Sequence, residues 1–183
     1  MEFDYVIVGG GSAGCVLANR LSADPAVTVC LLEAGGEDRN PWIHVPVGYV
    51  NTMNEPSVNW LFSPEPEAGA SDRRLPIPRG KVLGGSSAIN GLVYVRGQPR
   101  DYDTWFQLVN RCWSFQDVLP IFRRMEHYEQ GGDDLRAQGG PLRVSEATDE
   151  GPLYEAVRAA ADELGVAPNP DYNGASQEGI VRT

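Results

Sequence analysis

The chain has 183 residues and a formal net charge of −10, from 15 basic and 25 acidic side chains. Apolar residues make up 42% of it, too many for a disordered chain, and the length suits one domain with its own core. Its apolar runs are far shorter than the ~20 residues that cross a bilayer. No secretory leader is visible before Phe3, and the acidic balance without a basic stripe argues against nucleic-acid binding.

The three cysteines, Cys15, Cys30 and Cys112, have neither metal-binding nor redox spacing. Cys15 and Cys30 lie in apolar periodic segments, where a buried free thiol is ordinary. Three thiols cannot all pair with one another. We therefore expect no metal site, no disulfide framework and a reducing, cytoplasmic location.

The N-terminal residues have the pattern of a βαβ unit. Residues 3–8 are apolar and rich in β-branched and aromatic side chains, which predicts a buried strand. The glycine-rich turn 9–14 follows, and apolar residues at helical spacing then predict a helix to about Ser22. A second apolar run, 27–32, predicts another strand, closed by Glu33. The two strands should be parallel and joined by a right-handed crossover.

The rest of the chain changes in texture. Seven prolines between Gly35 and Pro78 exclude long helices and predict a loop-rich excursion, with a short strand near Trp60 to Ser63. A second glycine-rich block spans residues 80–97. Beyond it, the apolar periodicity and a capping box formed by Ser114 and Asp117 predict further elements. These are helices over 101–108, from 115 to about 125 and over 153–164, with a short strand at 142–144; residues 167–183 are polar and rich in Asn and Gly.

The first glycine-rich turn fits the pattern G-x-G-x-x-G at Gly9, Gly11 and Gly14. Gly9 permits the tight turn, Gly11 lets a pyrophosphate approach the backbone, and Gly14 lets the helix pack on the strand. The free N–H groups of the helix start would face the phosphates. Glu33, 19 residues after Gly14, can accept hydrogen bonds from ribose hydroxyls and would repel the 2′-phosphate of NADP. The alternative is that the glycines only punctuate a loop; the flanking strand, helix and acid favour a dinucleotide site, FAD or NAD.

The second glycine-rich block, GKVLGGSSAINGLVYVRG, with Pro78 and Arg79 before it, resembles the first signature of the glucose–methanol–choline (GMC) family of FAD-dependent oxidoreductases. The opening FDYVIVGGGSAGCVLANRLS and the LLEAG around Glu33 resemble the same family. So do the pair Asn59-Trp60 and the segments RGQPRDYDTW and GGPLRV. The resemblance covers nearly the whole chain. Within the family, it looks most like bacterial choline-dehydrogenase-like and other alcohol dehydrogenases.

The resemblance implies FAD as the cofactor, on an α/β, Rossmann-like FAD-binding fold. The implied contacts to its ADP part are Gly9, Gly11, Ser12, Ala13, Gly14, Glu33 and Ala34; those beside the pyrophosphate and flavin are Val82, Gly84, Gly85, Ser87, Asn90, Gly91, Leu92 and Val93. The residues agree, because paired glycines expose backbone N–H groups to an anion. The alternative, a flexible Gly/Ser linker, is disfavoured because apolar residues alternate with these glycines.

Three positions depart from the family pattern in this sequence. Some choline oxidases carry a histidine bonded to FAD just before the family asparagine; this chain has Ile89 there, which predicts noncovalent FAD. Members usually have Gly-Trp where this chain has Cys112-Trp113. They often have His-Gly near residues 137–139, which here read Ala-Gln-Gly. We expect altered packing in these two loops.

The resemblance also implies an activity: oxidation of the CH–OH group of an alcohol, with hydride transfer to flavin N5. In the family, a histidine with a second histidine or an asparagine near the C-terminus carries catalysis. This chain has His44 and His127, outside that context, expected as a packed or capping residue and on a helix surface or end. We therefore assign no catalytic residue. The electron acceptor stays open, and membrane association, allowed by analogy, has no supporting pattern.

The chain is accordingly expected to be the N-terminal portion of such an enzyme, an incomplete fold lacking its C-terminal portion. Its parts are the βαβ unit 1–35, the proline-rich excursion 36–78, the signature segment 79–103, and residues 114–183 with helices and the start of the substrate domain. Alone it should be inactive, bind FAD weakly or not at all, and aggregate. The alternatives are a stand-alone, non-catalytic dinucleotide-binding module and an NAD-dependent dehydrogenase.

Overall fold

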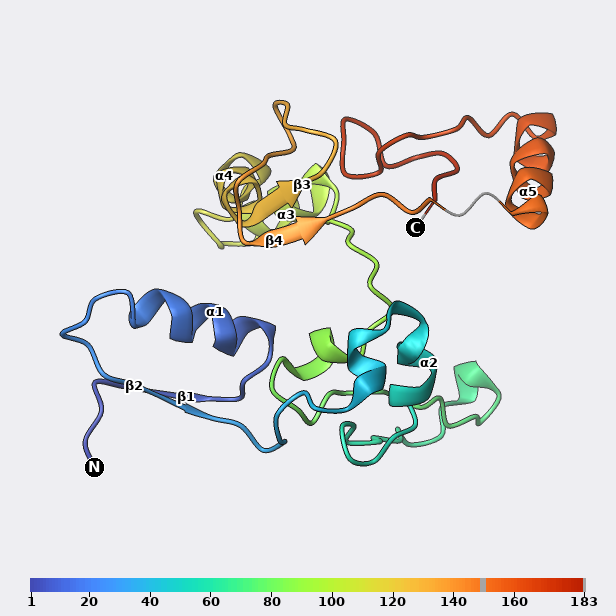
Figure 1. Cartoon of the computed structure of the whole chain (residues 1–183). Helices are drawn as coiled ribbons and strands as arrows, with labels where there is room; N and C mark the ends of the chain where they lie inside the picture. The colour runs from blue at the N-terminus through green and yellow to red at the C-terminus, as the bar shows by residue number, and fades with distance from the viewer. Residues whose placement is uncertain (149–150, 183) are drawn as a thin grey trace. The chain divides into compact units, whose positions relative to one another are not determined.

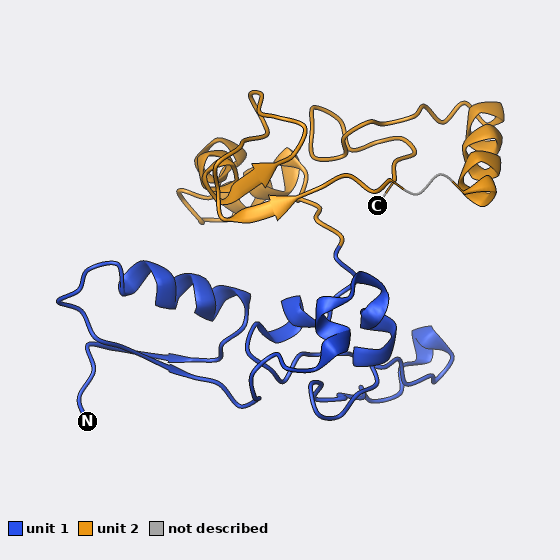
Figure 2. Cartoon of the chain, viewed as in Figure 1, with its two compact units in different colours: residues 1–92 blue, residues 93–183 orange. Residues whose placement is uncertain are grey.

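The computed structural model describes residues 1–148 and 151–182 (Figure 1). The chain divides into two compact units, residues 1–92 and 93–183, shown in different colours in Figure 2. No helix in the part of the chain that the structure describes is long and apolar enough to cross a membrane.

Unit 1 begins with the predicted βαβ unit. Strand β1 (Tyr5–Val8) pairs in parallel with β2 (Val29–Leu32), and helix α1 (Ser12–Leu21) packs against both strands (Figure 1). A Cβ atom at Gly14 would lie 1.9 Å from the Gly9 carbonyl oxygen, so the helix can approach the strand this closely only with glycine there. The α/β, Rossmann-like prediction is confirmed, with both strands starting about two residues later than expected.

One face of the β1–β2 pair carries exposed apolar side chains. Ile7 is buried, whereas Val6 and Val8, which point to the other face of the strand, are 58% and 84% exposed. Leu32, opposite Val8 in the register, is 52% exposed. Parallel sheets are ordinarily covered on both faces. This pair is covered only on the face that carries Ile7, and its other face leaves apolar side chains exposed.

The excursion after β2 consists of short turns, as its prolines predict. Two 3₁₀ turns, Pro41–His44 and Pro46–Gly48, lead into the one-turn helix α2 (Tyr49–Thr52), and a third 3₁₀ turn covers Ala68–Ala70. The Asn40 side chain caps the first turn by accepting a hydrogen bond from the Trp42 N–H (3.0 Å).

The prediction of a short strand near Trp60 to Ser63 is wrong. Phe62 makes only a single antiparallel bridge, with Ile77. The neighbouring prolines at 64, 66, 76 and 78 have no N–H to donate, so no continuous ladder forms, and pairing toward the tip of this hairpin is limited to another isolated bridge, between Glu67 and Arg73.

The apolar core of unit 1 joins this excursion to the second glycine-rich block. Val58, Val82 and Ile89 are each no more than 5% exposed and form one cluster, with Ile43 and Ala88 packed against it. The block is therefore part of the folded core and not a free linker.

Unit 2 contains three helices and a second pair of strands in its described part. The helices are α3 (Pro99–Gln107), α4 (Phe115–Met125) and α5 (Pro152–Glu163), close to the predicted ranges. The capping box of Ser114 and Asp117 at the start of α4 is confirmed.

Strand β3 (Glu126–Tyr128) was not predicted. It follows α4 without a break and pairs in parallel with β4 (Leu142–Val144). His127 therefore lies in a strand and not on a helix, where we expected it. Its Nδ1 atom accepts a hydrogen bond from the Gly139 N–H (3.0 Å), in the loop where the family pattern is altered.

A buried ionic cluster holds unit 2 together. The Glu126 carboxylate is fully buried and lies 2.8 Å from a terminal nitrogen of Arg96 and 2.8 Å from one of Arg136. Arg136 also pairs with Asp171 at 2.6 Å. Two positive and two negative side chains thus meet in a buried, charge-balanced group, in which each ion has a partner.

The Tyr128 ring lies against this cluster, with the Arg136 guanidinium carbon 3.7 Å from its centroid. The Tyr128 hydroxyl donates a hydrogen bond to Glu146. Burial, together with that carboxylate, raises the pKa of the Tyr128 hydroxyl well above its ordinary value.

Candidate functional site

The turn between β1 and α1 presents backbone N–H groups without a covering side chain. Gly9 adopts a left-handed conformation (φ +101°) and its N–H donates to the Leu32 carbonyl (2.7 Å). Gly11 is the N-cap of α1, and Ser12 and Ala13 are exposed in the first helical turn. Because glycine has no side chain to cap these N–H groups, they are open to an anion at the positive end of the helix.

The Glu33 carboxylate lies directly beneath this turn. One oxygen accepts a hydrogen bond from the Gly10 N–H (2.6 Å), and the other accepts one from the Gly35 N–H (2.8 Å). We expected this carboxylate to accept hydrogen bonds from ribose hydroxyls; the structure adds that it also joins the first glycine-rich turn to Gly35. Each carboxylate oxygen has two lone-pair directions, so Glu33 retains capacity for hydroxyl donors. Ala34, next to it, is exposed.

The second glycine-rich block runs alongside the first as an extended segment. Val82 forms a parallel bridge with Gly36, and Gly84 forms one with Gly11. The Leu83 N–H donates to the Gly36 carbonyl and the Gly84 N–H to the Gly10 carbonyl, both at 2.8 Å. The structure thus places side by side two segments that lie about 70 residues apart in the sequence.

Glycine is required where the two segments touch. A Cβ atom on Gly85, which has φ +58°, would lie 2.7 Å from the Gly11 Cα. One on Gly35 would lie 2.1 Å from the carbonyl carbon and oxygen of Lys81. The contact is therefore backbone against backbone, a distance that no side chain at these positions permits.

The remaining predicted cofactor residues lie in or just after a 3₁₀ turn, Gly85–Ala88. The Ser87 hydroxyl donates to the Gly84 carbonyl (2.5 Å), which closes this turn. The Asn90 side-chain oxygen accepts the Leu92 N–H (3.1 Å), and Leu92 is held at φ +65°, an uncommon conformation for a leucine. Gly91 between them is exposed, and Val93 begins unit 2.

Asn90 and Leu92 also line a cavity in unit 1. Its other wall comes from the 3₁₀ turns of the excursion and includes His44, which we expected as a packed or capping residue. His44 is exposed, and its Nε2 lies 2.6 Å from the Asp38 carbonyl oxygen. The sequence carried one signal for this wall, the apolar run WIHVPVG; nothing in it indicated that the run meets Asn90.

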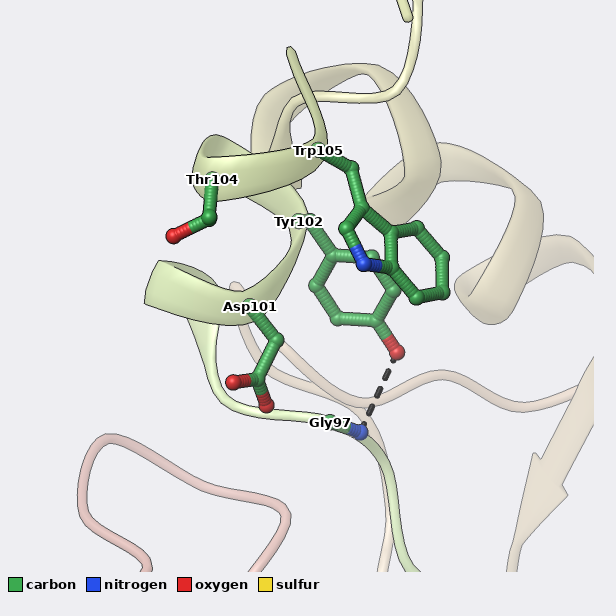
Figure 3. A pocket seen from close by; sticks show the side chains of 5 residues that line it. All are labelled: Gly97, Asp101, Tyr102, Thr104 and Trp105. Atoms are coloured by element: carbon green, nitrogen blue, oxygen red, sulfur yellow. Dashed lines mark hydrogen bonds between the residues drawn. The ribbon is translucent and has the colours of Figure 1, made fainter. Parts of the chain in front are cut away.

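A separate pocket lies in unit 2, at the start of α3 (Figure 3). Its lining consists of Gly97, Asp101, Tyr102, Thr104 and Trp105. The Tyr102 hydroxyl points to Gly97 and accepts its N–H (3.1 Å). None of the predicted cofactor residues belongs to it. Within residues 1–148 and 151–182, no group of His, Cys, Asp or Glu side chains is arranged to hold a metal ion.

The chemistry of the unit 1 site fits the ADP part of a dinucleotide. Uncapped N–H groups at the start of α1 suit a pyrophosphate, and the Glu33 carboxylate suits hydroxyl donors. The nearby cation, Lys81, has its Nζ 4.8 Å from the centroid of the Trp60 ring. The site thus offers neutral backbone donors at the anion position, with one carboxylate beneath them.

Comparison with known proteins agrees with this geometry. The family model described as GMC oxidoreductase matches residues 3–183. An oxygen-dependent choline dehydrogenase of Sinorhizobium fredii is 46% identical over 180 residues, 98% of this chain and 33% of that protein. An alcohol dehydrogenase [acceptor] of Pseudomonas putida is 45% identical over 179 residues, 97% of this chain and 32% of that protein.

Among solved structures, pyridoxine 4-oxidase from Mesorbium loti superposes with a TM-score of 0.92 at 37% identity. The match covers 98% of this chain and 36% of that one. The chain therefore spans about a third of the length of the relatives it matches.

Proposed function

Since the chain belongs to the GMC oxidoreductase family, we propose that it forms the FAD-binding N-terminal part of an enzyme that oxidises the CH–OH group of an alcohol. The relatives named as choline and alcohol dehydrogenases support this substrate class. One observation carries the proposal: the two glycine-rich segments meet at backbone distance, and the Glu33 carboxylate beside that contact accepts the N–H groups of Gly10 and Gly35.

In this proposal the chain's own backbone holds the cofactor. The N–H groups of Gly11, Ser12, Ala13 and Gly14 bind the pyrophosphate, and Glu33 accepts the ribose hydroxyls, with Gly9 and Ala34 shaping the turn. The second segment runs beside the pyrophosphate and flavin through Val82, Gly84, Gly85, Ser87, Asn90, Gly91, Leu92 and Val93. When bound, FAD supplies the acceptor for the hydride of the alcohol carbon, at its N5 atom.

The proposed attachment of FAD is noncovalent. The residue in the position of the family's FAD-linked histidine, Ile89, is 5% exposed and packs with Val58 and Val82 in the core. An aliphatic side chain cannot form the bond, and its place in the core gives it another purpose.

The group that accepts the alcohol proton belongs, in this proposal, to a further C-terminal portion of the enzyme. Neither histidine supplies it: His44 is bound to a loop carbonyl, and His127 is in strand β3. The 183 residues alone should therefore be inactive. The three cysteines are free, and the proposal retains a reducing, cytoplasmic setting.

A substitution of Gly11 tests the cofactor site. An alanine Cβ there would lie 3.8 Å from its nearest neighbour, so Gly11→Ala should fold normally. It would nevertheless place a methyl group over the uncapped helix start, and we expect FAD affinity to fall by about tenfold or more, the effect of roughly 1.4 kcal/mol. Titration of the chain with FAD and with ADP, followed by calorimetry, measures this.

The matched control is Gly36→Ala, where the Cβ meets nothing within 4 Å. It should leave both affinities unchanged. Equal affinities for the Gly11→Ala variant and the unchanged chain would contradict the proposed site. Saturable NADH binding without FAD binding would favour an NAD-dependent dehydrogenase, and tight, stoichiometric FAD in a monodisperse monomer would favour a stand-alone binding module.

A further inference from the structure

Asn59 is a buried polar residue outside both glycine-rich segments. It is 3% exposed, in a unit whose other buried side chains are almost all apolar or glycine. Its Nδ2 donates to the Met53 carbonyl (2.7 Å), and its Oδ1 accepts two N–H groups, from Leu61 and Arg79, each at 3.0 Å. One side chain therefore joins three points of the backbone that are up to 26 residues apart.

These bonds hold the start of the second glycine-rich segment. Arg79 immediately precedes Gly80, and Gly80 forms an antiparallel bridge with Asn59 itself. The Lys81 N–H donates to the Val58 carbonyl (2.7 Å), and the Trp60 N–H donates to the Arg79 carbonyl (2.9 Å). The segment is thus paired with residues 58–60 along one edge.

Farther along the chain, the same segment meets Gly36 and the first glycine-rich turn, residues 9–14. There Leu83 and Gly84 donate to the carbonyls of Gly36 and Gly10, and Gly85 abuts Gly11. Glycines have no side chain with which to fix this position. Side-chain hydrogen bonds to the backbone of 79–81 come instead from Asn59 and from Ser86, whose hydroxyl accepts the Gly80 N–H (3.1 Å).

Asn59 also stabilises an unfavourable backbone conformation. Leu61 has φ +53°, in the left-handed region that costs a non-glycine residue free energy. The hydrogen bond from its N–H to Asn59 Oδ1 closes a short side-chain turn that offsets this cost. Loss of the side chain would therefore release both the 59–61 turn and the Arg79 N–H.

We infer that Asn59 is a positioning residue, which fixes the second glycine-rich segment against the first glycine-rich turn. It thereby sets cofactor affinity without contacting the cofactor. The second half of this inference rests on the proposed function, whereas the first half can be tested with no ligand present.

Hydrogen exchange of the backbone amides is the direct test. In Asn59→Ala, the Leu83 and Gly84 amides should lose protection by about tenfold or more, because a buried acceptor and donor are lost and the segment opens locally. The amides of β1 and β2 should keep their protection, which shows that the variant is folded. A parallel FAD titration should show weakened binding.

Two further variants keep the inference falsifiable. Asn59→Asp replaces the alanine variant if alanine unfolds the unit. It retains the acceptor for the Leu61 and Arg79 N–H groups but loses the donor to the Met53 carbonyl, so we expect a smaller loss of protection at Leu83 and Gly84. Asn40→Ala removes an asparagine cap in the same unit that does not contact residues 79–85, and should leave Leu83 and Gly84 protected.

Unchanged protection at Leu83 and Gly84 in both Asn59 variants would overturn the inference. Loss of protection in every amide of unit 1 for the aspartate variant would overturn it too, because Asn59 would then serve the whole unit. If the protection falls as expected but Gly11→Ala leaves the FAD affinity unchanged, the positioning role stands and the proposed function fails.

Discussion

The two units of this chain are stabilised by opposite kinds of contact. In unit 1, the contacts that bring distant segments together are glycine backbones at van der Waals distance, as between Gly85 and Gly11, and hydrogen bonds from backbone N–H groups, including the one that the Glu33 carboxylate accepts from Gly10. In unit 2, they are buried charges, with Glu126 between Arg96 and Arg136. Bare backbone leaves N–H groups available to a ligand, whereas in the ionic cluster each charged side chain already has a charged partner. The comparison is consistent with the proposed cofactor site in unit 1, where the uncapped N–H groups lie.

The largest effect should come from breaking the ionic cluster. Glu126→Gln removes the negative charge that two buried guanidinium groups share, and leaving a buried charge without its partner costs about 3–5 kcal/mol. We expect that loss in the free energy of unfolding, measured by urea denaturation with the fluorescence of Trp105 and Trp113 after Trp42 and Trp60 of unit 1 are replaced by phenylalanine. Glu155→Gln, at a half-exposed pair with Arg158, is the control and should cost under about 1 kcal/mol. Similar losses for the two variants would show that the cluster is not what stabilises unit 2.

A smaller loss, confined to unit 1, is expected from Gly35→Ala. Its Cβ would overlap the Lys81 carbonyl at 2.1 Å, and such overpacking typically costs about 1–3 kcal/mol. Hydrogen exchange should show Leu83 and Gly84 opening, while β3 and β4 are unaffected. The adjacent Gly36→Ala has open space and should change the unfolding free energy by no more than about 0.5 kcal/mol. An equal response of the two neighbours would contradict the backbone-contact account.

The smallest effect should be a gain. Cys112, where the family pattern leads us to expect glycine, has φ +74°, a conformation that favours glycine. A left-handed conformation costs a non-glycine residue about 1–2 kcal/mol, partly offset by the greater unfolded-state entropy of glycine. Cys112→Gly should therefore stabilise unit 2 by about 0.5–1 kcal/mol, visible as a Tm increase of a few degrees.

Asn110→Gly, two residues earlier, provides the comparison for that gain. Asn110 is not among the residues with positive φ, so glycine there brings only its entropic cost. A Tm increase for both variants, or for neither, would show that the Cys112 backbone is not strained.

Local sequence patterns predicted most helices and strands of this chain, but they did not predict the contacts between these elements. The β-branched run before Gly9 and the Ser114–Asp117 capping box each specify a local geometry, and both were confirmed. Strand β3 was missed because Glu126, fully buried, resembles an exposed helical residue until its two arginine partners are known. These partners lie 30 and 10 residues away, and charge alone does not indicate such pairing.

The candidate site shows the same division. The glycine spacing predicted the turn, and the distance of Glu33 from it predicted a carboxylate beside that turn, because the binding of a phosphate or a ribose depends on residue types at fixed spacing. That Glu33 also bonds the N–H groups of Gly10 and Gly35, and that Asn59 ties the second segment in place, depends on chain segments meeting in three dimensions. The resemblance grouped the two glycine segments into one site; only the structure shows that they touch.

Lys81 is the one lysine among these 183 residues, and its ammonium group lies over the Trp60 ring beside the second glycine-rich segment. An amine-reactive dye would consequently attach at a single side chain, apart from the N-terminus, without any engineered cysteine. Acylation there would also remove the charge that is attracted to the ring, an interaction worth about 0.5–1 kcal/mol at an exposed site. The chain therefore offers one lysine at which an optical reporter can be attached, beside the segment that is proposed to bind the cofactor.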